Sequence, residues 1–179
     1  MNYREIKGDL ISLTLSGEFE VCVQGVNCFC VQKSGLAPQM VKAFKTNEFS
    51  QEAPARRGDI NKLGTIDYRH FEKDDKTGKF QPLVNWEWRS DYELTVVNAY
   101  TQFNFGANHQ GGDPKPLDYS ALTLCMKKIN RIFAGKKIGL PKIGAGLARG
   151  DWEIIKKIIQ NNMKECYVTI VEYEKQNDV

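Results

Sequence analysis

The sequence predicts a protein of the α/β class, with a mixed sheet and helices on both of its faces. Short apolar segments of strand character alternate along the chain with segments whose apolar residues recur at helical spacing. A charged turn sequence in the middle of the chain adds antiparallel strands to this pattern. The 179 residues show no repeat, low-complexity segment or linker, so we expect a single domain over residues 1–179.

The first half of the chain is expected to provide two strands and a helix. A strand over residues 3–7 ends before a Gly-Asp pair, and a valine-rich strand over 20–26 leads into a loop that ends near Gly35. The next helix carries Pro38 in its first turn, where a missing N–H costs little. The apolar face of this helix consists of Leu36, Met40, Val41 and Phe44.

The second half is expected to provide most of the sheet. The charged segment 73–79 predicts a hairpin tip. Asp118 and Asp151 can accept hydrogen bonds from first-turn N–H groups, so each is expected to cap a helix. We expect strands at residues 63–68, around Trp86 and Trp88, and at 93–100, 138–140 and 167–173.

Composition limits the class of protein and of partner. The chain is 41% hydrophobic, carries a net charge of +3, and has no apolar run of the roughly 20 residues that span a bilayer. We see no signal peptide and no clustered basic face, so neither a membrane nor a nucleic acid is an expected partner. The five cysteines are odd in number, and Cys28-x-Cys30 lacks zinc spacing. We therefore expect reduced thiols, a cytoplasmic location, and neither a metal nor a cofactor; we also expect a monomer.

One segment has the form of a phosphate site. An apolar strand over 138–140 is followed by a loop with Gly144, Gly146 and Gly150, and Asp151 then begins a helix. Glycine allows a ligand to approach the backbone closely, and free N–H groups with a helix dipole favour an anion. The glycine spacing differs from that of the dinucleotide fingerprint and of the P-loop. A plain strand-to-helix turn is the alternative interpretation.

Four segments, taken in order, resemble the macro domain family. They are Lys7-Gly8-Asp9-Leu10, the stretch from Val23 to Ala37, the stretch from Val96 to Phe103, and the stretch from Leu140 to Glu153. The resemblance covers nearly the full length. It looks closest to the branch of ADP-ribose 1''-phosphate phosphatases, bacteriophage macro proteins and terminal ADP-ribose glycohydrolases. It implies a three-layer α/β/α fold that binds ADP-ribose or ADP-ribose 1''-phosphate.

The resemblance also implies a place for each part of that ligand. Asp9, with the Leu10 N–H nearby, would accept from the adenine amino group, and Tyr173 is a candidate to cover the adenine. Asn27 would bond the distal ribose, which Phe103 would border. Turn, cap or packing roles are the alternatives for these residues. The pyrophosphate would lie between two loops, formed by Ser34, Gly35, Leu36 and Ala37 and by Gly144, Ala145, Gly146, Leu147 and Ala148.

The chain departs from the family where chemistry would occur. Gln24 stands where related phosphatases often have a histidine, and Ala148 where the glycohydrolases have an aspartate. Lys33 could reach an anionic group on the distal ribose or be a solvated surface lysine. We therefore expect a slow phosphatase or hydrolase of ADP-ribose 1''-phosphate, with Asn27 and Gln24 as catalytic candidates. The alternatives are a non-catalytic ADP-ribose reader and a hydrolase that removes ADP-ribose from protein or nucleic acid.

Overall fold

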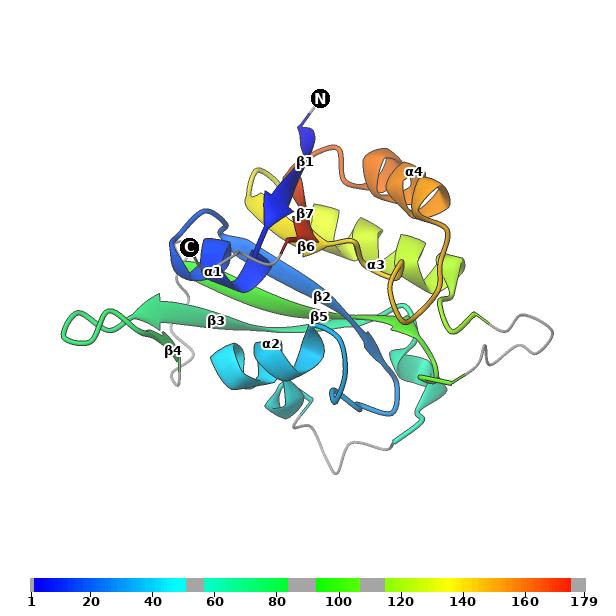
Figure 1. The fold of residues 1–179 in the computed structure, drawn as a ribbon, viewed down its shortest axis with the longest axis horizontal. Coiled ribbons are helices and arrows are strands. Elements are labelled where there is room, and N and C mark those ends of the chain that lie inside the picture. Colours follow the sequence, from blue (N-terminus) through cyan, green and yellow to red (C-terminus); the bar gives the residue numbers. More distant parts are fainter. Residues whose placement is uncertain (1, 51–56, 84–92, 107–114, 175–179) are drawn as a thin grey trace.

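The structure is a computed structural model that describes residues 2–50, 57–83, 93–106 and 115–174. In these ranges, seven strands form one mixed sheet in the order β1-β7-β6-β2-β5-β3-β4 (Figure 1). The strands from β1 to β5 in this order run parallel to their neighbours, whereas β3 is antiparallel to β5 and β4. The strands are β1 (Tyr3–Gly8), β2 (Val21–Asn27), β3 (Ile66–Lys73), β4 (Phe80–Pro82), β5 (Leu94–Gln102), β6 (Lys137–Pro141) and β7 (Tyr167–Tyr173).

Helices cover both faces of this sheet, which confirms the expected α/β architecture (Figure 1). Aspartates cap three of them, because Asp9, Asp118 and Asp151 each accept from an N–H of the first turn. The helices are α1 (Leu10–Leu15), α2 (Ala37–Phe44), α3 (Tyr119–Ile132) and α4 (Trp152–Asn162), with 3-10 turns η1 (Thr46–Glu48) and η2 (Ile60–Lys62).

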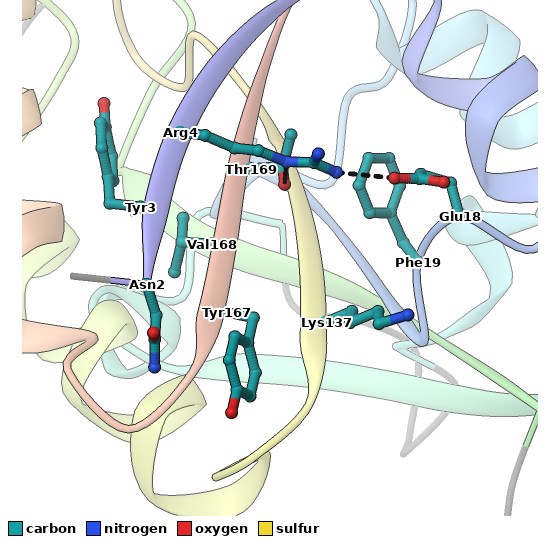
Figure 2. A pocket seen from close by; sticks show the side chains of 9 residues that line it. All are labelled: Asn2, Tyr3, Arg4, Glu18, Phe19, Lys137, Tyr167, Val168 and Thr169. Carbon is teal, nitrogen blue, oxygen red and sulfur yellow. Dashed lines mark hydrogen bonds and ion pairs between the residues drawn. The ribbon is translucent and has the colours of Figure 1, made fainter.

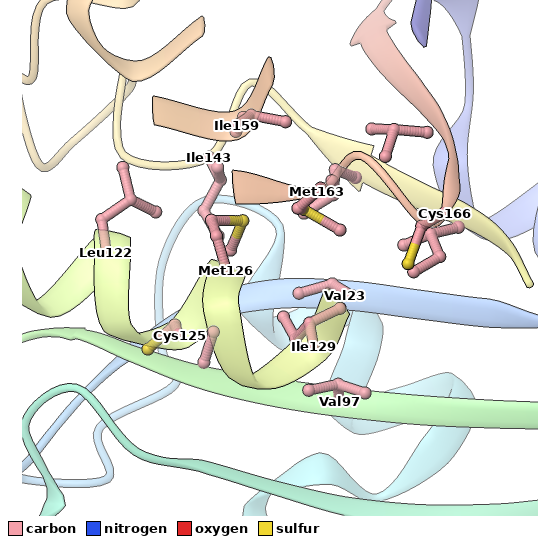
Figure 3. Close-up of a cluster of buried hydrophobic side chains, with 14 of the residues drawn as sticks. Val23, Val97, Leu122, Cys125, Met126, Ile129, Ile143, Ile159, Met163 and Cys166 are labelled. Atoms are coloured by element: carbon pink, nitrogen blue, oxygen red, sulfur yellow. The ribbon is translucent and has the colours of Figure 1, made fainter. Parts of the chain in front are cut away.

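The alternation of side chains along β2 divides the core into two layers. Val21 and Val23 face α3 and α4, whereas Cys22 between them faces α1 and α2. Figure 3 shows the α3 and α4 layer, in which Ile129 and Ile159 pack with no exposed surface. Burial of a side chain of this size contributes roughly 1.5–3 kcal/mol, so the core fixes both helices on the sheet.

Two elements differ from the sequence expectations. Helix α1 was not expected, because six residues are too short for a helical periodicity to show; Asp9 begins it and buried Leu10 anchors it. Strand β3 begins at Ile66 rather than near residue 63, because η2 and Gly64 turn the chain first, with a Gly64 φ of 76°. The hairpin tip between β3 and β4 is confirmed, whereas the strand expected around Trp86 and Trp88 lies outside the described residues.

No helix within the described ranges has the length and apolar content needed to cross a bilayer. In the same ranges, no three His, Cys, Asp or Glu side chains are grouped so that they could hold a metal ion.

Candidate functional site

A gap opens between two neighbouring strands at the carboxyl edge of the sheet. Strand β2 pairs with β5 from Val21 to Asn27, but it pairs with β6 only at Val21 and Cys22. Gly25, beyond the last pair with β6, is exposed although it lies inside a central strand. The order of the chain also reverses here, with β6, β7 and β1 on one side and β5 on the other. Parallel sheets bind ligands at such switch points, beyond the carboxyl ends of the strands.

The second loop, residues 142–150, follows β6 and borders this gap. Four backbone bonds within residues 141–150 fold it into consecutive turns: Ile143 N to Pro141 O at 2.6 Å, Ala145 N to Lys142 O at 3.1 Å, Arg149 N to Gly146 O at 3.0 Å and Gly150 N to Gly144 O at 2.8 Å. Within the described residues, the N–H groups of Gly146, Leu147 and Ala148 donate to no protein acceptor. The loop therefore presents consecutive donors whose arrangement is set by its own backbone.

The glycines of the second loop have different surroundings. Gly144 has a φ of 75°, and a Cβ there would lie 2.8 Å from Leu117. A Cβ on Gly150 would collide with the Leu117 side chain and lie 2.8 Å from the Gly144 carbonyl oxygen, so both glycines are required by packing. Gly146 has open space at its Cβ position and is exposed. Of the three, Gly146 is the one that leaves room for a ligand.

The N-terminus of α4, after this loop, is closed by the protein. Asp151 accepts from Glu153 N at 2.9 Å, and its own N–H donates to Tyr119 Oη at 2.9 Å. The expectation that Asp151 caps this helix is confirmed, and its carboxylate occupies the helix N-terminus. The N–H groups of the second loop that have no described acceptor lie before this helix.

The first loop, residues 28–36, follows β2 on the other side of the gap. The Asn27 side chain, which is 6% exposed, donates to Val31 O at 2.9 Å and accepts from Val31 N at 3.2 Å. These bonds hold the start of the loop, so the carboxamide that was expected to contact ribose also has a structural role.

The N-terminus of α2, at the end of the first loop, is open. Its N-cap residue Leu36 makes no side-chain capping bond, unlike the aspartates that cap α1, α3 and α4. In the part of the chain that the structure describes, the N–H groups of Ser34, Gly35, Leu36 and Ala37 have no protein acceptor. These donors point the partial positive charge of a helix terminus at the solvent.

The two loops lie next to each other. A Cβ added to Gly35 would lie 3.5 Å from Leu147 Cδ1, so the tip of the first loop faces the tip of the second. Leu147 is 68% exposed, and Lys33, Ser34 and Gly35 are also exposed. The structure thus brings together the two loops between which the resemblance to macro domains implies a pyrophosphate.

Asp9, Leu10 and Tyr173 lie at one end of this edge. Gly8 pairs with Tyr173 across β1 and β7, so Asp9 and the 65% exposed Tyr173 side chain are close in the fold. Asp9 caps α1 through Oδ1, which accepts from Ser12 N at 2.7 Å. Leu10 is buried, and its N–H donates to no described protein group. The cap interpretation of Asp9 holds, and its Oδ2 has no bond to another described residue.

Phe103 and Gln24 lie toward the other end of the edge. Phe103 packs edge-on against Phe29, with ring centroids 5.3 Å apart. Gln24 is 2% exposed and donates to Gln32 Oε1 at 3.1 Å and to Asn98 Oδ1 at 2.9 Å. This placement favours a role for Gln24 in holding the first loop over direct contact with a ligand. Ala148 is 8% exposed.

The sequence reasoning missed a polar row that crosses the sheet beneath the first loop. Gln24, Asn98 and Asp67 are in register on β2, β5 and β3. Burial raises the pKa of Asp67, whose Oδ2 accepts from Tyr100 Oη at 2.6 Å. A polar Asn98 within the apolar strand 94–100 is the signal that could have revealed the row.

The Cys28 thiol near the site is not activated. Cys28 is fully buried, and burial raises its pKa to about 12, so it is protonated at neutral pH.

A hollow lies at the amino ends of β1, β6 and β7, on the edge of the sheet away from the two loops (Figure 2). Its arginine, Arg4, is paired with Glu18 at 2.6 Å and donates from Nε to Thr169 Oγ1 at 2.9 Å. The Glu18 carboxylate therefore neutralises the Arg4 guanidinium in this hollow.

Comparison with known proteins places this geometry in a family. The chain matches no established protein-family profile. It is 32% identical over 178 residues to an uncharacterised protein from the tk-vs intergenic region of Enterobacteria phage T4, and the match covers 97% of this chain and 98% of the phage protein.

Two solved structures share the fold. The macrodomain of Mycobacterium tuberculosis DarG superposes with a TM-score of 0.64 at 18% identity, over 97% of this chain and 98% of that chain. Thermosipho africanus DarTG, solved in complex with ADP-ribose, superposes with a TM-score of 0.68 at 11% identity, over 100% of this chain and 43% of that chain. The chain therefore belongs to the same family as the phage T4 protein and has the macrodomain fold that its four sequence segments predict.

Proposed function

We propose that this protein binds ADP-ribose along the carboxyl edge of its sheet. The observation that carries the proposal is the pair of facing loops, each with free N–H groups, on either side of the gap between β2 and β6. A diphosphate between these loops would accept from both, and backbone donors with a helix terminus can offset its charge without an arginine.

The rest of the edge is long enough for the adenine and the distal ribose, and it carries polar groups that could bind them. Strands β1 and β2 are three spacings apart in the sheet, which is roughly 14 Å at about 4.8 Å a spacing. Asp9, after β1, offers a carboxylate to the adenine amino group, and Asn27 ends β2 beside the position proposed for the distal ribose. The complex of Thermosipho africanus DarTG with ADP-ribose, on the same fold, also supports this ligand.

Gly146→Glu tests the proposal most directly. The Gly146 position has open space and its φ is not left-handed, so the variant should fold with unchanged stability. Its carboxylate would stand where the diphosphate is proposed to lie, and calorimetry should detect no ADP-ribose binding.

Gly146→Gln is the matched control, because it adds the same bulk without the charge. We expect intermediate weakening of ADP-ribose binding for this variant, since the added bulk remains but the charge repulsion is absent. Tight binding of ADP-ribose to a folded Gly146→Glu protein would show that the second loop is a structural turn.

We further propose that the protein has a slow phosphatase activity on ADP-ribose 1''-phosphate. Lys33 is exposed in the first loop, close in sequence to the free N–H groups, where its ammonium could attract a terminal phosphate. His70, the histidine within the described ranges, lies on β3 with Nδ1 2.8 Å from Thr95 Oγ1, so hydrolysis would rely on positioning and charge stabilisation. General acid–base help is worth about 10²–10⁴ in rate, and its absence predicts slow turnover.

Phosphate release from ADP-ribose 1''-phosphate distinguishes this activity from binding alone. Lys33→Ala should reduce phosphate release several-fold, whereas Lys42→Ala, at the other end of α2, should leave it unchanged. Binding of the 1''-phosphate without any release would leave an ADP-ribose reader. Removal of ADP-ribose from protein or nucleic acid is disfavoured by Ala148, which supplies neither base nor nucleophile.

A further inference from the structure

A cluster of buried polar side chains lies directly beneath the first loop. We call it the polar bridge, and it consists of Gln24 on β2, Gln32 in the loop, Thr46 in η1 and Asn98 on β5. Gln24, Thr46 and Asn98 are at most 2% exposed. Burying carboxamides and a hydroxyl costs free energy unless they are hydrogen-bonded, so the arrangement of their bonds is informative.

The bonds of the polar bridge converge on Gln32. Its Oε1 accepts from Thr46 Oγ1 at 2.6 Å and from Gln24 Nε2 at 3.1 Å, and its Nε2 donates to Thr46 O at 3.4 Å. The sheet holds the other members, since Gln24 Nε2 also donates to Asn98 Oδ1 at 2.9 Å and Asn98 Nδ2 donates to Thr46 O at 2.9 Å. One loop side chain is thereby tied to two central strands and to η1.

Gln32 lies between the part of the loop that Asn27 holds and the residues whose N–H groups are free. Asn27 holds Val31 just before it, and the free N–H groups of Ser34 to Ala37 follow shortly after it. Beyond them, Met40 and Phe44 fix α2 in the core. The orientation of the free donors is therefore set between the hydrogen bonds at residues 31 and 32 and the apolar anchor of the helix.

We propose that the polar bridge positions the N–H groups of the first loop for phosphate, with Thr46 as the key positioning residue. This inference rests on the proposed ADP-ribose site. Lys33, Ser34 and Gly35 make no hydrogen bond to another described residue, so an unbridged loop would have to be ordered by the ligand at a cost in affinity. A bridged loop meets the phosphate already ordered, and the low dielectric around buried groups strengthens the hydrogen bonds that hold it.

Thr46→Val tests the inference, because it removes the hydroxyl donor and preserves the shape. We expect about tenfold weaker ADP-ribose binding, which is the size associated with one buried hydrogen bond. Thr46→Ser restores the hydroxyl and should restore wild-type affinity to within about twofold. Adenosine, which lacks the phosphates, should bind to Thr46→Val as it does to the wild type.

Thr95→Val is the matched control for the loss of a buried hydroxyl. Thr95 is 4% exposed on the same sheet, and its Oγ1 lies 2.8 Å from His70 Nδ1, away from the first loop. It should lower the melting temperature without changing ADP-ribose affinity. Equal weakening by Thr46→Val and Thr95→Val, or none by Thr46→Val, would overturn the positioning role.

A measurement without ligand separates this inference from the proposed function. Backbone amide order parameters from ¹⁵N relaxation should fall at residues 33–36 in Thr46→Val and stay unchanged in Thr95→Val. If wild-type protein fails to bind ADP-ribose while these order parameters fall, the proposed ligand is wrong and the positioning of the loop stands. Unchanged order parameters in Thr46→Val would contradict the inference itself.

Discussion

The two loops that border the gap are held in shape by different means. The first loop makes backbone bonds at Cys28 and Cys30, and beyond them it is fixed by side chains, through the bonds of Asn27 to Val31 and of the polar bridge to Gln32. The second loop is fixed by its own backbone turns and by the packing of Gly144 and Gly150 against Leu117. Both nevertheless present free N–H groups to the same space.

The proposed phosphate site would therefore be formed by two loops that are stabilised in different ways. The second loop is sensitive to a Cβ added at its packed glycines, Gly144 and Gly150, and tolerant of one at Gly146. A loop fixed by buried side chains is sensitive to the loss of single polar groups. We therefore expect different substitutions to destabilise the first loop and the second loop.

Gly150→Ala should have the largest effect. The new Cβ would meet both Leu117 and the Gly144 carbonyl oxygen, so the backbone of the second loop must move. We expect a loss of about 3 kcal/mol in the free energy of unfolding, measured by urea denaturation. Gly146→Ala, in open space, should stay close to wild type, and an equal loss in both variants would disprove the assigned packing roles.

Asn27→Ala should destabilise the first loop by removing a side chain that holds it. The change leaves Val31 N and Val31 O without their side-chain partners, and we expect a loss of about 2 kcal/mol in stability with weaker ADP-ribose binding. Asn162→Ala removes a carboxamide that donates to Ile158 O at 2.7 Å on α4. That control should leave ADP-ribose affinity intact, as calorimetry can establish.

Asp9 and Asp151 allow a cap to be separated from a ligand contact. Asp151→Ala should cost about 1 kcal/mol of stability without affecting ADP-ribose affinity. Asp9→Ser keeps a capping oxygen but removes the carboxylate, so its stability should stay within a few tenths of a kcal/mol while ADP-ribose affinity falls about tenfold. An unchanged affinity of Asp9→Ser would remove Asp9 from the site.

Asp67, in the polar row beneath the first loop, gives the stability of the fold a pH dependence. Burial raises its pKa, so the folded protein binds this proton more tightly than the unfolded chain does. Ionisation therefore disfavours folding as the pH rises from the ordinary carboxyl pKa through the raised one. Asp67→Asn keeps an acceptor for Tyr100 and should gain stability relative to wild type across that window. Urea titrations of both proteins from about pH 4 to 8 check this, and a constant difference would contradict it.

The sequence alone determined the alternation of strands and helices. It also determined where the two loops follow their strands. Asp118 and Asp151 were predictable as caps, and strand 167–173 as a strand, because capping and periodicity depend on neighbours within a few residues. The residues of both loops were predictable as a group from their resemblance to a known family.

The tertiary structure alone decided how those loops are held in shape and which of their groups stay free. It joined Gln24, Gln32, Thr46 and Asn98 from four separate segments, left α2 uncapped while Asp151 closed α4, and made Gly150 a packing position while Gly146 stayed open. Such outcomes depend on distances between atoms far apart in the chain. Local sequence pattern carries no record of those distances, because they are set when the sheet and its helices pack together.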